Sequence, residues 1–427
     1  MNDPTLQTML TLAALAYRGF QDVLPGEPHE AIVRHALRDG LDGVNALAPV
    51  KGHWELVWGP ETSRVPLGVF DSSAMYVVRH KRDRQRYVAA IRGTNPVAST
   101  DWLFGDFWVG QTVPWPYASD GAAISMSTAL GLASLQAMRS RPLSTVGEVA
   151  DKALSSRLVT DALGKLSQAG RAALSGTTVT HVAHPSSLEA QVERIVTTWL
   201  THGTQRDVLA KALTQADNPL RVESSRLRPK WRPAQDRADG LDLLSFLKDE
   251  VDKAKGAPLE VIVTGHSKGG ALAPAVALWL RDALDSSDPQ ERWGDKSSIQ
   301  VSSYAFAGPT PGNEGFAGRI DTVLGSGHHH LRNMHDLVTH AWQVDELQKL
   351  PALYGTRSAV FGALLPDLLR TVAPLNYRHA KSGVVTFEGR LDDNRLFVPE
   401  FIHQHLDAYL DHLGLLGQGI NAVTFFI

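Results

Sequence analysis

The stretch LEVIVTGHSKGGALA, residues 259–273, decides the fold. Its first six residues form an apolar, partly β-branched run that is typical of a buried strand. The small-residue segment 270–284 then predicts a packed helix. A Gly-x-Ser-x-Gly turn between a strand and a helix lifts the serine hydroxyl out of a sharp bend. The stretch therefore predicts a nucleophile, Ser267, with the backbone N–H of Lys268 facing the same space at the helix N-terminus.

The segments on either side alternate between strand-like and helix-like patterns. Residues 74–91 predict a β-hairpin, and 242–254 predict an amphipathic helix. Near the N-terminus, Asp3 and Pro4 suit the start of another helix. Further strands are predicted at residues 301–306, 329–333 and 384–387. Such alternation indicates the α/β class, with a mostly parallel central sheet flanked by helices.

The composition divides the chain of 427 residues into three parts. Residues 1–139 and 239–427 carry the strand and helix patterns, so we expect them to form the N-terminal and C-terminal parts of one core. Between them, residues 140–238 are rich in Ala, Ser, Thr, Arg and Gln and contain helical patches. This middle part is predicted to be an inserted helical cap.

Composition also excludes several classes of protein. The 42 Lys and Arg are interspersed with 45 Asp and Glu, for a net charge of -3, so nucleic acid is not an expected partner. The chain has no cysteine, which excludes disulfides and thiolate metal sites. No apolar stretch reaches the roughly 20 residues of a transmembrane helix. The apolar run 9–17 is too short for a good signal peptide, so we expect a cytoplasmic protein or one exported without a signal peptide.

A serine nucleophile needs a base, and the base needs an orienting carboxylate. In α/β-hydrolases these follow the serine in the order acid, then histidine. Asp336 is the preferred acid because it comes just after a predicted strand, where a residue at the top of the sheet belongs. Asp345 and Glu346 lie further into the connection and are weaker alternatives, and Asp336 could instead serve as a helix cap or turn residue.

Five histidines follow Asp336 and compete for the role of base. They are His340, His379, His403, His405 and His412. His405 stands at the boundary of a helical run near the end of the chain and is the preferred candidate, while His340 is close to Asp336 in sequence. Spacing alone does not decide among them.

Taken together, these motifs resemble the class 3, fungal-type lipases. The resemblance rests on motifs that follow one another in the family's order: residues 90–94 with 101–103, then 263–273 around the nucleophile, then 305–313 and 332–338. It implies an α/β-hydrolase fold, and it implies that Thr94 supplies the second oxyanion contact through its backbone N–H. It also supports Asp336, sets His379 aside, and favours His405 because a tyrosine, Tyr409, follows it on the predicted helix. Lys268 stands where the family usually has leucine.

The resemblance covers residues 70–138 and 238–412 and implies a serine carboxylic ester hydrolase without a cofactor. A triacylglycerol lipase is the preferred function, with a phospholipase A or short-chain carboxylesterase as alternatives. Outside the enzymes, a non-catalytic interaction module with the same fold is the alternative. The substrate would be a lipid or other ester, met at the surface of a lipid droplet or micelle.

An aromatic segment follows the oxyanion region at the position that serves as a lid in this family. Its candidate substrate-binding or lid residues are Trp102, Leu103, Phe104, Phe107 and Trp108. The insertion is a second candidate for the lid. The run His328-His329-His330 does not predict a metal site, because successive strand residues face opposite sides. We expect it to be a solvated loop leading into a strand.

Overall fold

The computed structural model describes residues 3–18, 29–43, 46–64, 71–93, 109–140, 240–358 and 360–416. Three sequence predictions lie outside these residues. They are the oxyanion residue Thr94, the lid segment Trp102 to Trp108, and residues 141–238 of the predicted cap 140–238.

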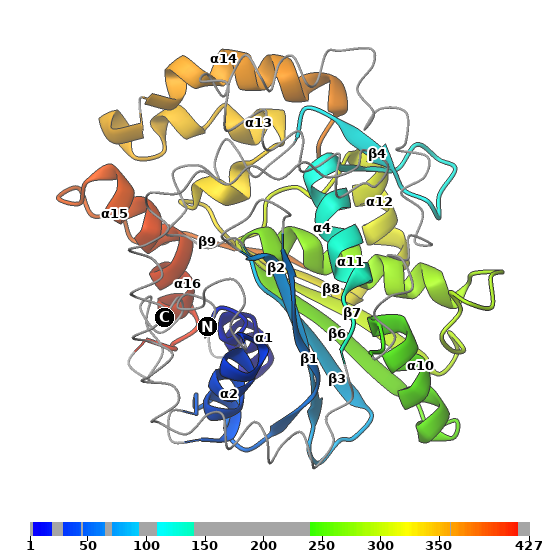
Figure 1. The fold of residues 1–427 in the computed structure, drawn as a ribbon. Helices are drawn as coiled ribbons and strands as arrows, with labels where there is room; N and C mark the ends of the chain where they lie inside the picture. Colours follow the sequence, from blue (N-terminus) through cyan, green and yellow to red (C-terminus); the bar gives the residue numbers. More distant parts are fainter. Residues whose placement is uncertain are drawn as a thin grey trace, which may run out of the picture.

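A seven-stranded sheet forms the centre of the molecule, in the order β1-β2-β3-β6-β7-β8-β9 (Figure 1). The strands are β1 (Trp54–Arg64), β2 (Asp71–His80), β3 (Arg86–Ile91), β6 (Leu259–His266), β7 (Ile299–Phe306), β8 (His328–Asn333) and β9 (Val384–Phe387). β1, β2 and β3 pair antiparallel, which confirms the hairpin, whereas every pair from β3 to β9 is parallel. The predicted α/β class with a mostly parallel sheet is therefore confirmed.

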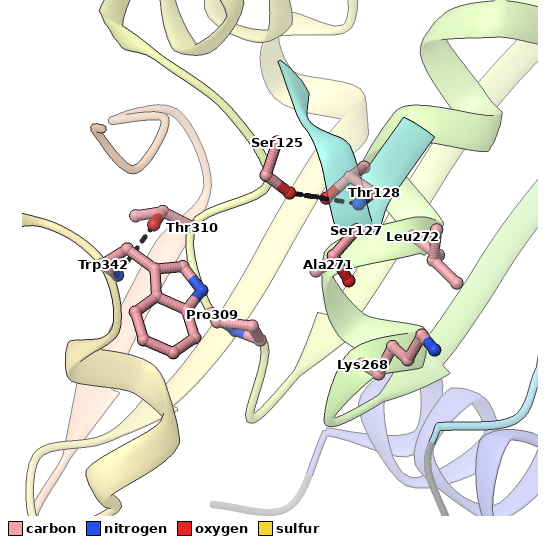
Figure 2. Close-up of a pocket in the computed structure, with 9 residues that line it drawn as sticks. All are labelled: Ser125, Ser127, Thr128, Lys268, Ala271, Leu272, Pro309, Thr310 and Trp342. Atoms are coloured by element: carbon pink, nitrogen blue, oxygen red, sulfur yellow. Dashed lines mark hydrogen bonds between the residues drawn. The ribbon is translucent and has the colours of Figure 1, made fainter. Parts of the chain in front are cut away.

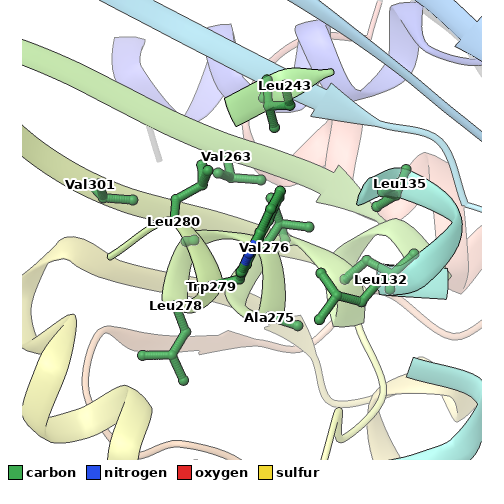
Figure 3. Close-up of a cluster of buried hydrophobic side chains, with 14 of the residues drawn as sticks. Leu132, Leu135, Leu243, Val263, Ala275, Val276, Leu278, Trp279, Leu280 and Val301 are labelled. Atoms are coloured by element: carbon green, nitrogen blue, oxygen red, sulfur yellow. The ribbon is translucent and has the colours of Figure 1, made fainter. Parts of the chain in front are cut away.

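Helices cover both faces of this sheet, because alternate strand residues point to opposite sides. In β6, Val261 and Val263 pack with α4 (Met126–Ala137), α10 (Leu243–Ala254) and α11 (Lys268–Leu284), as Figure 3 shows in part. Ile262, between these valines, packs on the other face with α1 (Pro4–Leu15) and α2 (His29–Asp42). The buried strand predicted from 259–264 is thus apolar on both sides.

The predicted helix starts are confirmed by their capping bonds. The Asp3 carboxylate accepts from the N–H groups of Thr5 at 2.9 Å and Leu6 at 3.1 Å, with Pro4 in the first turn of α1. Asp242 caps α10 by accepting from the Ser245 N–H at 2.8 Å. Both caps satisfy N–H groups that the helix itself leaves without partners.

A helical layer that the sequence analysis did not predict connects β8 to β9. It contains α13 (Val344–Leu347) and α14 (Val360–Val372), and it lies beyond the carboxyl end of the sheet (Figure 1). Trp342, Tyr354 and Phe361 belong to its separate apolar core. The chain then passes through α15 (Phe397–Ile402) and α16 (Ala408–His412). The short hairpin of β4 (Thr112–Pro114) and β5 (Ala123–Ser125) contacts α4, and α12 (Glu314–Val323) contacts α11 and β5.

The expectation for the histidine run is wrong. His328 to His330 are the first residues of β8 rather than a solvated loop, and both His328 and His330 are buried. Ser303 on β7 hydrogen-bonds His328 Nδ1 at 2.7 Å.

None of the helices in the described ranges is long and apolar enough to span a membrane.

Acid should destabilise this fold through its buried histidines. Burial lowers the pKa of His328 to about 4, and it holds the pKa values of His266, His330 and His379 well below the usual 6.5. The unfolded chain therefore binds protons that the folded chain excludes, so the free energy of unfolding decreases as pH falls below about 6.5. Each such histidine adds a slope of roughly 1.4 kcal/mol per pH unit.

Urea unfolding between pH 7.5 and 4.5 measures this slope. His328→Gln keeps a polar partner for Ser303 but removes one titrating group, so we expect a shallower pH dependence. His53→Gln, at an exposed position, is the matched control. Identical slopes in the wild type and His328→Gln would contradict the assignment.

Candidate active site

Ser267 occupies a strained bend between β6 and α11. Its backbone has φ 61° and ψ -126°, a conformation that L-residues rarely adopt. Its N–H donates to the Phe306 carbonyl at the end of β7 at 2.9 Å, and its side chain is buried, with 5 % of the residue exposed. The sequence therefore forms the predicted strand–turn–helix, with the serine at its sharpest point.

Glycines permit this bend because other backbone segments approach them closely. A Cβ at Gly265 would lie 2.2 Å from the Gly269 carbonyl oxygen, and one at Gly269 would lie 2.5 Å from the Ile91 carbonyl oxygen. A Cβ at Gly93 would come within 2.5 Å of the His266 carbonyl oxygen. The end of β3 is thus pressed against the turn that bears Ser267, and no side chain larger than hydrogen fits at these contacts.

The structure brings Asp336 and His405 together, although they are 69 residues apart. Nδ1 of His405 lies 2.9 Å from Oδ2 and 3.0 Å from Oδ1 of Asp336. Asp336 follows β8, is fully buried, and also accepts from the Val338 N–H at 3.0 Å. A carboxylate oxygen can only accept, so Nδ1 carries the proton and the carboxylate fixes the imidazole tautomer.

His405 also lies against the turn that bears Ser267. The rings of His405 and His266 have centroids 4.7 Å apart, and His266 Nε2 is 2.9 Å from the His405 carbonyl oxygen. Since Nδ1 faces Asp336, Nε2 is the nitrogen at the far side of the ring, the one that a serine hydroxyl needs. The Asp336–His405 pair therefore lies against the turn that bears Ser267, at the carboxyl end of the sheet.

A π-helical turn, which the sequence analysis missed, carries His405. A π-helix of five residues, His403–Asp407, lies between α15 and α16. Such insertions are rare and occur frequently at functional sites. No periodic pattern in the sequence marks this turn, because it widens a helix that is otherwise regular.

Tyr409 completes the surroundings of the acid. Its hydroxyl donates to Asp336 Oδ2 at 3.0 Å and accepts from the Asn333 N–H at 2.9 Å. Burial raises the pKa of Tyr409 well above its usual value of 10, so the hydroxyl keeps its proton and remains a donor. In the sequence, Tyr409 served only to favour His405 among the histidines, and its bond to the acid was not predicted.

The weaker candidates for acid and base make other contacts. His340 lies 2.6 Å from Glu346, and its second nitrogen is 2.9 Å from the Met334 carbonyl oxygen. Burial opposes ionisation of Glu346, yet hydrogen bonds from His340 and Lys349 hold its pKa well below the usual value. Asp345 forms an ion pair with Arg378. These groups make a structural network rather than a second triad.

The three remaining histidines contact groups other than Asp336. His379 hydrogen-bonds the Thr339 carbonyl at 2.9 Å. His403 lies 3.6 Å from Asp407 in the same turn, and His412 stacks on Phe387. Within the described ranges, no three histidine or acidic side chains lie close enough together to hold a metal ion.

A small hollow lies next to the first turn of α11. Figure 2 shows its lining, to which Trp342 contributes its indole ring and Thr310 its hydroxyl. The Thr310 hydroxyl accepts a hydrogen bond from the backbone N–H of Trp342. The full lining is Ser125, Ser127, Thr128, Lys268, Ala271, Leu272, Pro309, Thr310 and Trp342. The Lys268 N–H itself begins α11, where the helix dipole favours negative charge.

The chain has the α/β-hydrolase fold, with Ser267 at the turn between β6 and α11. A solved structure titled as that of M37 lipase has the same fold, with a TM-score of 0.67 and 24 % identity over 99 % of this chain and 95 % of that one. Lip2 lipase from Yarrowia lipolytica aligns more loosely, with a TM-score of 0.36 and 11 % identity over 80 % and 77 % of the two chains.

Residues 242–346 match the family Lipase (class 3). A chloroplastic galactolipase of Arabidopsis thaliana, DONGLE, is 33 % identical over 97 residues, which are 23 % of this chain and 19 % of the relative. This chain therefore aligns with only about a fifth of the length of that curated relative. The segment that carries both Ser267 and Asp336 is therefore similar to the class 3 lipases.

The contact between Gly265 and Gly269 makes a testable prediction. In Gly265→Ala the new methyl group would overlap the Gly269 carbonyl, so we expect the free energy of unfolding to fall by about 1–3 kcal/mol. The turn must shift as well, so activity should fall more than stability explains. Gly318→Ala, in α12 with nothing near the new methyl group, is the control and should gain roughly 0.5–1 kcal/mol. Denaturant unfolding measures both changes. If Gly265→Ala were as stable as the wild type, the close contact between Gly265 and Gly269 would be contradicted.

Proposed function

We propose that this protein is a serine hydrolase of lipid carboxylic esters, and that its preferred substrate is a triacylglycerol. The observation that carries the proposal is the buried Asp336–His405 pair, packed against the strained turn of Ser267. The family match over residues 242–346 supports the same conclusion.

In the proposed reaction, the Ser267 hydroxyl attacks the ester carbonyl while His405 Nε2 takes its proton. Asp336 holds the imidazole and stabilises the imidazolium that forms. The proton then passes to the leaving alcohol, and an acyl-enzyme remains on Ser267. Water, deprotonated by His405, releases the fatty acid and regenerates the serine.

The tetrahedral oxyanion requires two hydrogen-bond donors. The Lys268 N–H is the first, since it follows Ser267 directly at the start of α11. Thr94 is proposed as the second. A Cβ built at Gly93, the residue before it in the sequence, would lie 3.1 Å from the Ser267 Cβ, which supports this proposal. No cofactor is required.

The aromatic segment Trp102 to Trp108 is proposed as a lid. It lies in the sequence between the oxyanion residue and Val109, which is buried in the apolar core above the site. A lid that opens exposes apolar surface, and contact with a lipid droplet or micelle offsets that cost. The insertion 140–238 is the second candidate for this role.

A phospholipase A and a short-chain carboxylesterase use the same machinery and are the alternative functions. The relative in Arabidopsis thaliana is named a galactolipase, so a galactolipid belongs in the same comparison. A non-catalytic module is disfavoured, because a buried carboxylate and imidazole beside a strained serine are costly to maintain without a chemical use.

Replacing the nucleophile should abolish turnover. In Ser267→Ala we expect ester hydrolysis to fall by several orders of magnitude, on the order of a million-fold where such a triad is complete. Ser303→Ala removes a buried serine that also bonds a histidine, and it should keep activity within a few-fold. A fluorophosphonate probe should label the wild type and Ser303→Ala but not Ser267→Ala. Activity in Ser267→Ala above about one per cent of wild type would refute the mechanism.

The substrate class is tested with triacylglycerols of several chain lengths, phospholipids, galactolipids and p-nitrophenyl esters. For a triacylglycerol lipase with an interfacial lid, the rate should rise abruptly when the substrate exceeds its solubility. Deleting the aromatic side chains, as in Trp102→Ala with Trp108→Ala, should weaken this rise and spare soluble esters. A smooth saturation curve with soluble short-chain esters preferred would instead indicate a carboxylesterase.

A further inference from the structure

We propose that His266 is a positioning residue whose ring N–H holds the π-helical turn that presents His405 to Ser267. This inference rests on the proposed function, because it concerns how the base of that reaction is kept in place. His266 precedes the nucleophile in sequence, so one short segment would carry the attacking hydroxyl and also orient its base.

The hydrogen bond fixes which tautomer His266 adopts. Its Nε2 lies 2.9 Å from the His405 carbonyl oxygen, and that oxygen can only accept, so Nε2 carries the proton. The ring is buried, with 1 % of the residue exposed, and its edge-on neighbour is Tyr409. A buried, directional bond of this kind holds its partner in one place.

The π-helical turn depends on such donors, because widening a helix alters the partners of its carbonyl groups. Two consecutive carbonyls of the turn accept side-chain N–H groups. The Gln404 carbonyl accepts from Asn333 Nδ2 at 2.8 Å, and the His405 carbonyl accepts from His266. The donors come from the carboxyl ends of β8 and β6, so the turn is fastened to two strands of the sheet.

His266 is itself held from its other side. The Tyr17 hydroxyl donates to the His266 carbonyl at 3.2 Å and accepts from the Gly93 N–H at 3.1 Å. Tyr17 follows α1, so an N-terminal segment connects the end of β3 to the nucleophile turn. Both the backbone and the ring of His266 are thus positioned before any substrate arrives.

His266 does not compete with His405 for the proton. Burial, and then the neighbouring charge of His405, lower the pKa of His266 well below 6.5. It therefore stays neutral while His405 becomes an imidazolium. Its effect on the reaction is geometric: a displacement of about 1 Å in a reacting group can cost on the order of a hundred-fold in rate.

Two substitutions separate the bond from the bulk of the ring. His266→Leu removes the donor at similar volume, while His266→Gln keeps an N–H at a comparable reach. His328→Leu, a buried histidine on β8 that contacts no residue of the proposed triad, is the control for lost stability. Each full-length protein is assayed for kcat and KM on a soluble p-nitrophenyl ester, for the rate of fluorophosphonate labelling, and for Tm.

We expect His266→Leu to lose about ten- to a hundred-fold in kcat and labelling rate, with KM within two-fold of wild type. His266→Gln should recover most of this loss. His328→Leu should lower Tm by a similar amount and keep kcat within two- to three-fold. Equal kcat in His266→Leu and His328→Leu, or no recovery in His266→Gln, would overturn the proposal.

If His266→Leu does not fold, His266→Asn and His266→Gln decide, because the shorter amide of asparagine cannot reach the His405 carbonyl. Retained kcat in both would overturn the positioning role, and loss in asparagine alone would support it. Failure of the proposed function looks different: the wild type itself would not react with the fluorophosphonate. If the wild type is labelled and the His266 variants keep its kcat and labelling rate, only the positioning role of His266 is refuted.

Discussion

The architecture of the site depends on the strained backbone of Ser267. A residue with φ 61° and ψ -126° persists only where its surroundings enforce that conformation. Here the Phe306 carbonyl accepts a hydrogen bond from the Ser267 N–H. The glycines at 265 and 269 let neighbouring backbone segments approach to van der Waals contact. The ends of β3, β6 and β7 therefore meet at the turn that bears Ser267.

Prediction from the sequence succeeded where the cause lies in adjacent residues. Asp3 and Asp242 cap helices through N–H groups two or three residues away, and the glycines around Ser267 mark its turn directly. The pairing of Asp336 with His405 came from the order of motifs and a family resemblance, because spacing alone left five histidines open. The structure then placed only one of them against that acid.

The features that were missed depend on tertiary contacts or on short, irregular segments. Within the connection from β8 to β9, α13 has four residues and several 3₁₀ turns have three or four, too few to show a period. α14 is longer, and its apolar spacing could have predicted it despite Pro366. The π-helical turn and the bond from Tyr409 to Asp336 arise only when distant strands are already in place.

The burial of Asp336 explains why so many groups surround it. A carboxylate with no exposed surface is unfavourable unless its oxygens are paired, and three donors reach it here, from His405, Tyr409 and the Val338 N–H. These bonds form on folding, so the site is oriented before substrate binds. When His405 takes a proton, the new charge appears beside an anion already fixed in a water-poor environment, and little has to move. The same burial that complicates folding thus favours the proposed proton transfer.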